Sequence, residues 1–310
     1  MAAMPHLHLS RLGGPIILSL MVAVVTGFRL PPASEICCSL AEESLILCAN
    51  SSAAGGGKDA APAVHIALVT LATPEIYGYA AYTAAINAAY AKTFGHSFQV
   101  ASTSPHLAGA GQQLVWRAGN VATILDVLES GAGGADWIAY MDADACLVDF
   151  SAGDALVSAL RQYAGEEVHL LMSRGELIGP GSSSLFNSGF ALLRNHPWTV
   201  KLVRLWWSEL TKTTGNDQEM LERLYRSDAL DAKRHMVVLP IGLFYNEIGD
   251  PIAGPPQEQH VIHLAGVPSE VRRGVFGRFW QGLCAAASGA EGALADEASP
   301  SSTALQLRFV

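Results

Sequence analysis

Two carboxylates, Asp142 and Asp144, directly follow an apolar run at residues 137–141. Such a run is typical of a central strand that is buried on both faces. Because charges are costly to bury, we expect both carboxylates where the strand leaves the sheet, close enough together to need a cation. Ligands of open α/β sheets bind at the carboxyl ends of the strands. Two hard oxygen ligands there suit Mn²⁺ or Mg²⁺, shared with the phosphates of a substrate.

Strand-like and helix-like runs alternate between residues 64 and 280 and must position this pair. We predict strands at 64–71, 96–102, 137–141, 168–173, 186–194, 235–239 and 260–264. We predict helices at 74–94, 116–130, 151–163 and 197–211, and one that begins near 216. This alternation predicts an α/β fold, a mainly parallel sheet flanked by helices in one Rossmann-like domain. No Gly-x-Gly-x-x-Gly follows the first strand, so a dinucleotide site is unsupported.

Three helix starts carry local signals. Thr73 and Pro74 suit an N-cap and the first helical position, and Gly95 suits the end of the same helix. Capping-box patterns begin at Ser151, with an acidic residue at 154, and at Asn216, with an acidic residue at 219.

The ends of the chain differ in composition from this domain. Residues 13–30 form an apolar segment, which we interpret as a signal anchor after a cytosolic tail at 1–12. Its uncharged part, 13–28, spans about 24 Å as a helix, so a cleaved signal peptide remains the alternative. Residues 31–63 suit a flexible stem, 64–283 the catalytic domain and 284–310 a disordered tail.

Both readings of the apolar segment place the domain in the secretory lumen. The sequon at Asn50 lies in the stem and is compatible with N-glycosylation. Cys37 and Cys38 are both candidates to pair with Cys48 in an oxidising lumen. Cys146, inside an apolar run, suits a buried free thiol.

Composition indicates the size of the core and argues against a nucleic-acid partner. The chain has 310 residues, of which 50% are apolar and 15% are charged, so it can bury a sizeable core. Its net charge is −9 and it holds no cluster of Lys and Arg, which argues against a nucleic-acid partner.

A strand that ends in Asp-x-Asp has two known chemical uses. In haloacid-dehalogenase-like phosphatases the first Asp is a nucleophile and the second a general acid, a frame that Asp142 and Asp144 fit. That family carries its motif at the start of its core domain, whereas here two strands and two helices come first. In sugar-nucleotide transferases the carboxylates instead hold a divalent cation that neutralises a diphosphate leaving group.

Later motifs favour the transferase. They are Phe-Asn-Ser-Gly-Phe at 186–190, Leu-Leu-Arg-Asn at 192–195, Pro-Trp at 197–198, Asn-Asp-Gln-Glu at 216–219 and Val-Ile-His-Leu-Ala-Gly at 261–266. With them the chain resembles the Golgi galactosyl-, mannosyl- and xyloglucan xylosyl-transferase family, in order, over residues 64–280. It departs from that family at Trp116-Arg117, where a Lys-containing motif is frequent, and after His263, where related retaining families have Lys-Pro-Trp.

The resemblance implies a role for each motif. The candidate metal ligands are Asp142, Asp144 and His263, and a neutral imidazole suits Mn²⁺ better than Mg²⁺. The candidate contacts of the donor in these motifs are Asp142, Asn187, Ser188, Gly189 and Gly266. Arg117 stands where the chain departs from that family; its charge makes it a candidate contact of the phosphate or nucleotide, and a solvated arginine on a helix is the equal alternative. Asp217 and Gln218 are the candidate catalytic pair, facing the anomeric carbon and the acceptor.

We therefore expect a GT-A glycosyltransferase, anchored in the Golgi membrane as a single-pass type II protein, with its catalytic domain in the lumen. It would move a hexose or pentose from UDP-galactose, UDP-xylose or GDP-mannose to a glycan acceptor, with retention implied by resemblance. A catalytically inactive glycan-binding protein is the alternative outside enzymes. Because the two carboxylates repel one another, we also expect the metal-free protein to tolerate, or even gain stability from, the loss of Asp144.

Overall fold

A computed structural model describes residues 64–109, 111–150, 153–174, 185–239, 245–247 and 260–287. The expected cytosolic tail, signal anchor, stem and sequon, and the cysteines at 37, 38 and 48, lie outside these ranges. Within them, no helix is long and apolar enough to cross a membrane.

The main sheet has six strands in the order β2-β1-β3-β6-β5-β7. The strands are β1 (Ile66–Leu71), β2 (Ser97–Ala101), β3 (Trp137–Met141), β5 (Leu170–Arg174), β6 (Phe186–Arg194) and β7 (Met236–Leu239). The pairs β1–β2, β1–β3 and β5–β7 are parallel, and β6 runs antiparallel to β3 and β5. The expected α/β class with a mainly parallel sheet is thus confirmed.

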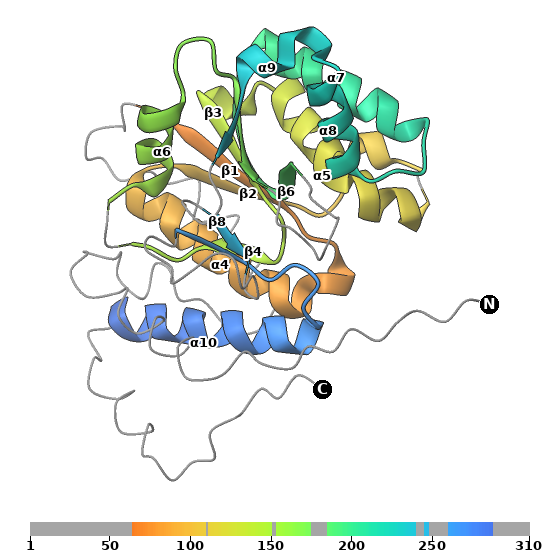
Figure 1. The fold of residues 1–310 in the computed structure, drawn as a ribbon. Helices are drawn as coiled ribbons and strands as arrows, with labels where there is room; N and C mark the ends of the chain where they lie inside the picture. Colours follow the sequence, from red (N-terminus) through yellow and green to blue (C-terminus); the bar gives the residue numbers. More distant parts are fainter. Residues whose placement is uncertain are drawn as a thin grey trace, which may run out of the picture.

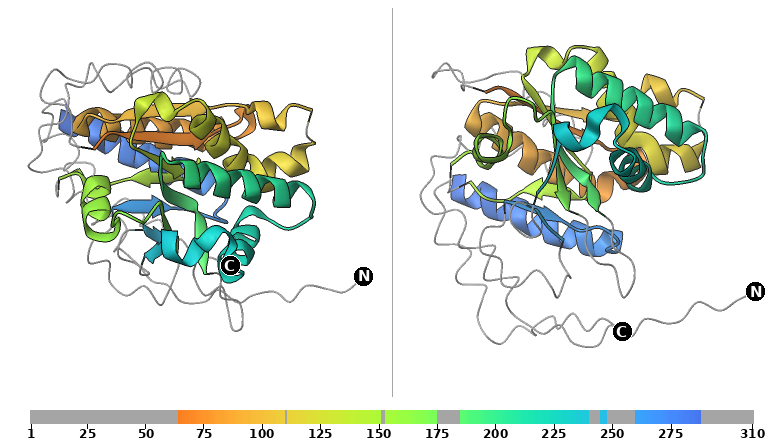
Figure 2. Two further views of the ribbon diagram at one scale, coloured as in Figure 1. Left: turned by 90° about the horizontal axis from the view of Figure 1, so that it is seen from above. Right: turned by 45° about the horizontal axis from the view of Figure 1, so that its top comes forward.

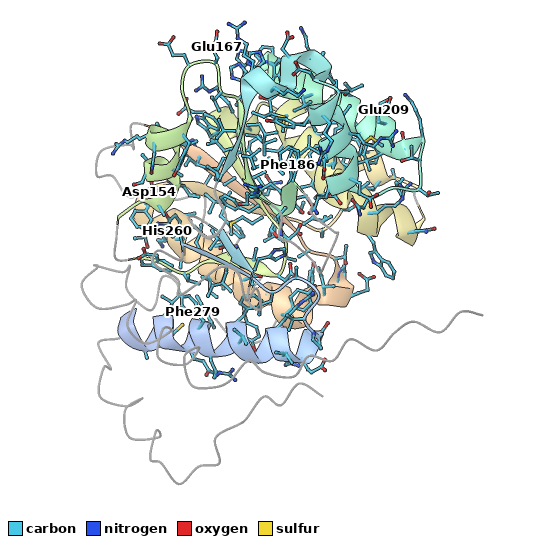
Figure 3. All side chains as sticks on the ribbon, in the orientation of Figure 1. Asp154, Glu167, Phe186, Glu209, His260 and Phe279 are labelled. Atoms are coloured by element: carbon cyan, nitrogen blue, oxygen red, sulfur yellow. The ribbon has the colours of Figure 1, made fainter. Side chains whose placement is uncertain are left out.

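Helices cover both faces of this sheet (Figures 1 and 2). They are α4 (Tyr77–Phe94), α5 (Gln112–Glu129), α6 (Ala155–Tyr163), α7 (Pro197–Thr211), α8 (Asp217–Arg226), α9 (Ala232–His235) and α10 (Ser269–Ala287). Alternate residues of β1 enter different cores: Ile66 and Leu68 join the core under α4, α6 and α10, whereas Ala67 and Val69 join the core under α5, α7 and α8. Figure 3 shows Phe186 inside the molecule and Glu167 at its periphery.

A small second sheet lies beside the end of β3. It has the order β4-β9-β8, formed by β4 (Ala145–Leu147), β8 (Tyr245–Glu247) and β9 (Val261–His263). Strand β4 follows β3 after one tight turn and pairs antiparallel with β9, so that Ala145 lies opposite His263. The turn between the two sheets therefore holds both aspartates and adjoins the histidine.

Local signals explain where several helices begin and end. Helix α4 follows a 3-10 turn at Pro74–Ile76 and ends at Gly95, whose φ of 76° is the left-handed conformation that favours glycine. Asn216 caps α8 by accepting a hydrogen bond from the Glu219 amide. The cap of α6 is Asp154, which accepts from the Val157 amide, so the helix begins later than the pattern at residue 151 predicted.

The C-terminal part of the described chain departs from expectation. Helix α10 was not predicted, and it continues to Ala287, past the expected domain boundary at 283. Cys284 on this helix is disulfide-bonded, which spacing in the sequence did not indicate because pairing depends on geometry. Cys146 is a buried free thiol, as expected, and burial raises its pKa.

Candidate metal centre

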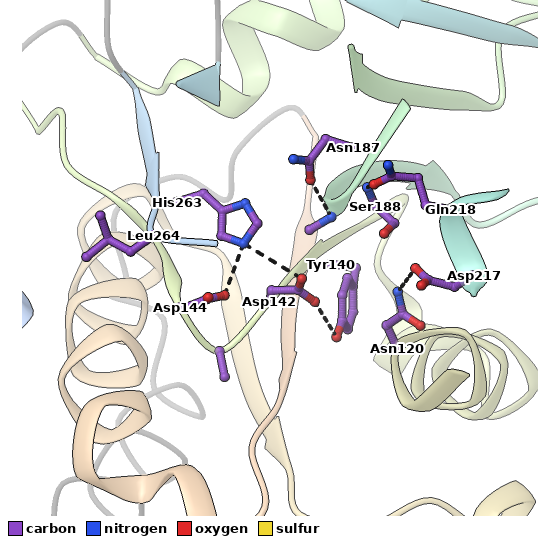
Figure 4. A network of polar contacts seen from close by, with 12 residues as sticks. Asn120, Tyr140, Asp142, Asp144, Asn187, Ser188, Asp217, Gln218, His263 and Leu264 are labelled. Carbon is purple, nitrogen blue, oxygen red and sulfur yellow. Dashed lines mark hydrogen bonds and ion pairs between the residues drawn. The ribbon is translucent and has the colours of Figure 1, made fainter. Parts of the chain in front are cut away.

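Asp142, Asp144 and His263 meet in the turn between the two sheets (Figure 4). His263 Nε2 lies 3.0 Å from Asp144 Oδ1 and 3.8 Å from Asp142 Oδ2. One ligand atom from each of the three residues lies within 4.8 Å of the others. Hydrogen bonds hold the backbone on both sides, because the Asp142 amide donates to the Gly189 carbonyl and the Leu264 amide donates to the Asp144 carbonyl.

The two carboxyl groups have opposite electrostatic environments. Burial, with the charges of Asp144 and Asp217, outweighs the attraction of His263 and raises the pKa of Asp142 to about 7. The Asp142 side chain keeps 35% of its surface exposed, so water moderates this effect. Burial would also raise the pKa of Asp144, but the hydrogen bond and charge of His263 and the charge of Arg272 together lower it.

Gly189 leaves the space into which the Asp142 carboxylate and the His263 imidazole project. A Cβ at this position would lie 2.5 Å from His263 Cε1 and 2.9 Å from Asp142 Oδ2. The Gly189 amide donates to Asn187 Oδ1 at 2.8 Å, in the part of β6 where its pairing with β5 shifts register. Asn187 is buried, and its side chain turns back to its own strand. The sequence thus needs glycine here for the close approach of His263 and Asp142. Its expected contact with a sugar remains a prediction.

Asp217 and Gln218 begin helix α8 on the other side of Asp142 in Figure 4. Gln218 Oε1 accepts from the Ser188 amide at 3.2 Å, and Asp217 Oδ2 accepts from Asn120 Nδ2 at 2.6 Å. Burial raises the pKa of Asp217, against the effect of hydrogen bonds from Ser188 and Asn120. The structure therefore joins the Asn-Ser-Gly and Asp-Gln motifs in one network.

In the part of the chain that the structure describes, Arg117 and Gly266 form no hydrogen bond with Asp142, Asp144 or His263. Arg117 Nη1 donates to the Leu210 and Gly215 carbonyls at 3.3 and 2.7 Å, so it ties α5 to the segment that leads into α8. Gly266 has a φ of 71° in the turn that leads from β9 to α10, and no atom lies within 4 Å of a Cβ built there. Their contacts with a substrate remain predictions.

Three polar residues that contact the candidate site were not predicted from the sequence. Tyr140 donates its hydroxyl to Asp142 Oδ1 at 3.2 Å, Asn120 binds Asp217, and Arg272 forms an ion pair of 3.1 Å with Asp144 Oδ2. Tyr140 lies two residues before Asp142, on the same face of the strand, which is a signal that alternation supplies. Asn120 and Arg272 carry no such signal, because each is brought in by a helix distant in sequence.

The donor set suits a divalent cation. Two carboxylates and one imidazole supply hard oxygen and borderline nitrogen ligands, which fits Mn²⁺ and, less well, Mg²⁺. The side chains of Asp144 and His263 are 12% and 4% exposed, so the ligands are mostly held by protein. A side chain at Gly189 would fill the same space. These residues therefore fit a bound ion.

The fold is that of GT-A glycosyltransferases. A glycosyltransferase involved in glycosylation of the major capsid of PBCV-1 superposes with a TM-score of 0.55 at 13% identity, covering 69% of this chain and 98% of that one. The galactosyltransferase LgtC, in complex with donor and acceptor sugar analogs, matches with a TM-score of 0.39 at 14% identity, covering 70% and 99%. Mouse xyloside xylosyltransferase 1 matches with a TM-score of 0.39 at 11% identity, covering 66% and 99%.

Sequence comparison adds nothing to this likeness. No family model matches the chain, and no curated protein matches it. At these identities the structural likeness defines the fold alone.

Proposed function

We propose that this protein is a metal-dependent glycosyltransferase that moves a hexose or pentose from a nucleotide sugar to a glycan. The observation that supports it best is the convergence of Asp142, Asp144 and His263 at the carboxyl end of β3, in a glycosyltransferase fold. UDP-galactose, UDP-xylose and GDP-mannose are the candidate donors. Retention of the anomeric configuration belongs to the same proposal.

In the proposed function, Asp142, Asp144 and His263 would hold Mn²⁺ or Mg²⁺. The ion would supply positive charge where the departing diphosphate accumulates negative charge. Asp144, whose pKa is lowered, is the ligand that stays ionised over the widest pH range. Because of its exposed surface, Asp142 is also placed to accept a hydrogen bond from the donor.

The second group of residues would orient the sugar. Asp217 is held by Asn120, and Gln218 is held by the Ser188 amide, so the rotamers of both are fixed before a substrate binds. Carboxylate and amide groups recognise hydroxyl patterns in fixed directions, and such orientation accounts for much of the rate in transfer reactions. We assign Asp217 and Gln218 to the sugar and the attacking hydroxyl on this basis.

A donor screen tests the function. The full-length protein is incubated with UDP-galactose, UDP-xylose and GDP-mannose, with Mn²⁺ or with EDTA, and release of UDP or GDP is measured. We expect one donor to be cleaved in Mn²⁺ only. Binding of a donor without cleavage would favour the inactive glycan-binding protein. Metal-dependent hydrolysis of p-nitrophenyl phosphate through a phosphorylated Asp142 would favour the phosphatase.

Metal binding should depend on pH through Asp142. Its pKa of about 7 means that below this pH the proton competes with the ion, so Mn²⁺ affinity should rise as pH increases from 6 to 8. Below the pKa, each pH unit should cost up to about tenfold in affinity from this group. Calorimetric titration at several pH values measures the slope.

Asp142→Asn provides the control for this slope. The variant should bind Mn²⁺ more weakly at every pH, with a flatter dependence over the same range. An unchanged slope in this variant would assign the titration to another group.

A further inference from the structure

Arg272, near the start of α10, contacts the same aspartate as His263. Its Nη2 lies 3.1 Å from Asp144 Oδ2, and its Nε donates to the Leu264 carbonyl at 2.9 Å. The guanidinium also lies over the ring of Tyr79, 4.9 Å from its centroid. The Arg272 side chain is 15% exposed. These contacts come from separate parts of the chain and fix one mostly buried cation.

Two hydrogen bonds and one ion pair link Asp144, Leu264 and Arg272 in a closed ring. The Leu264 amide donates to the Asp144 carbonyl at 3.0 Å, while the Leu264 carbonyl accepts from Arg272. The guanidinium then returns to the Asp144 carboxylate. Rotation of that carboxylate breaks the ring, and so does movement of β9 away from the β3–β4 turn. The ring therefore constrains both Asp144 and the strand that carries His263.

The two oxygens of Asp144 have different partners as a result. Oδ2 faces Arg272, and Oδ1 lies 3.0 Å from His263 Nε2. An ion that binds between the aspartates and the histidine would use Oδ1, while Oδ2 keeps its partner. Hydrogen-bonded partners of this kind orient the ligands of metal sites and tune their affinity.

We propose that Arg272 is a positioning residue of the metal centre, which holds Asp144 by one oxygen and presents the other to the ion. This inference rests on the proposed function. It gives helix α10 a part in the centre, through a residue that lies outside the motifs of the transferase family. The guanidinium acts through Asp144 and through Leu264 next to His263.

The geometry requires arginine rather than any cation. The planar guanidinium presents Nε and Nη2 in a fixed fork, which reaches the Leu264 carbonyl and the Asp144 carboxylate together. A lysine ammonium keeps the charge, but it cannot reproduce the fork or the stacking on Tyr79. Arg272→Lys therefore separates position from charge.

A purely repulsive role for Arg272 predicts the opposite effect on the affinity for the metal ion. A cation 3.1 Å from a metal ligand also repels an incoming ion, and it competes for the same carboxylate. If repulsion dominated, removal of Arg272 would tighten metal binding. If orientation dominates, as we propose, removal weakens it.

The test measures Mn²⁺ binding to the full-length protein by calorimetry, in the presence of UDP and, in parallel, of GDP. We expect Arg272→Ala and Arg272→Lys each to weaken Mn²⁺ binding by about 10–100-fold. Arg273→Ala is the matched control, since this neighbour on α10 is exposed, and it should bind Mn²⁺ as the wild type does. Thermal unfolding of the metal-free variants reports on the fold, and Arg272→Lys carries the test if Arg272→Ala fails to fold.

The outcomes separate this inference from the function itself. Weaker Mn²⁺ binding in folded Arg272 variants supports it. Unchanged or tighter binding overturns it, as does a lower melting temperature with normal Mn²⁺ affinity. Full rescue by lysine also overturns it, because charge alone would then suffice. A wild type that cleaves a donor while the Arg272 variants bind Mn²⁺ normally refutes the inference alone. A wild type that binds no Mn²⁺ with either nucleotide refutes the proposed function as well.

Discussion

Replacement of Asp144 by asparagine should strongly reduce metal-dependent binding and cleavage of the donor. The substitution keeps the shape of the side chain but removes the charge that faces both His263 and Arg272. Metal ions contribute several kcal/mol to the stabilisation of a transition state, so turnover should fall by roughly a thousandfold. Calorimetry with Mn²⁺ and a donor-cleavage assay measure the two effects.

Loss of Asp144 should also reduce the stability of the metal-free protein. The sequence suggested the reverse, because two neighbouring carboxylates repel one another. In the structure the pKa of Asp144 is lowered, since His263 and Arg272 stabilise the charged form more than burial opposes it. Removing the charge leaves the Arg272 guanidinium without its anion, which costs about 1–3 kcal/mol.

Glu209→Gln is the control for the loss of one negative charge. Glu209 on α7 pairs with Lys212, which follows the end of that helix, and exposed pairs of this kind contribute about 0–1 kcal/mol. This variant should retain metal binding, donor cleavage and melting temperature. Normal Mn²⁺-dependent cleavage in Asp144→Asn would remove Asp144 from the metal centre.

Local patterns in the sequence predict much of the fold. The structure places β6 at Phe186–Arg194 and α7 at Pro197–Thr211, both with the predicted bounds. Each has a clear signal, an apolar run in the strand and a proline in the first turn of the helix. The strand before Asp142 is buried at every position, as its apolar run indicated.

Helix α10 shows where local patterns fail. Its sequence is interrupted by Gly274, Gly277 and Gly282, and each glycine lowers the propensity for helix. Packing compensates, because Phe276 and Trp280 are buried in the core that α10 shares with α4. A Cβ built at Gly277 would lie 3.6 Å from the ring of Tyr82, an ordinary contact distance, so packing against α4 does not itself require this glycine.

Sequence patterns likewise predict some residues of the candidate site and not others. The order of the motifs was enough to propose Asp144 and His263 together, although 119 positions separate them. Their proximity follows from pairing between β4 and β9, two strands of three residues each. Arg272 and Asn120 could not be found from sequence, because each reaches its aspartate from a helix whose orientation only the tertiary fold defines.

Gly189→Ala should weaken Mn²⁺ binding and donor cleavage, although alanine can adopt the backbone conformation at this position. The added Cβ would lie 2.5 Å from His263 Cε1, 2.9 Å from Asp142 Oδ2 and 3.1 Å from Asn187 Oδ1. The first two contacts are too short to exist, so the imidazole and the carboxylate must move apart. Displacement of catalytic groups by about 1 Å costs on the order of a hundredfold in rate, and we expect at least this loss in donor cleavage.

Gly282→Ala on α10 is the matched control for this substitution. No atom lies within 4 Å of a Cβ built at Gly282, so this alanine should leave Mn²⁺ binding unchanged and stabilise the helix by about 0.4–1 kcal/mol. Mn²⁺ titrations and thermal unfolding of both variants separate a local clash from a general effect of alanine. If Gly189→Ala binds Mn²⁺ like the wild type, then the ion is not held between Asp142 and His263. Weaker binding at a near-normal melting temperature would instead place the ion in the space that this glycine leaves open.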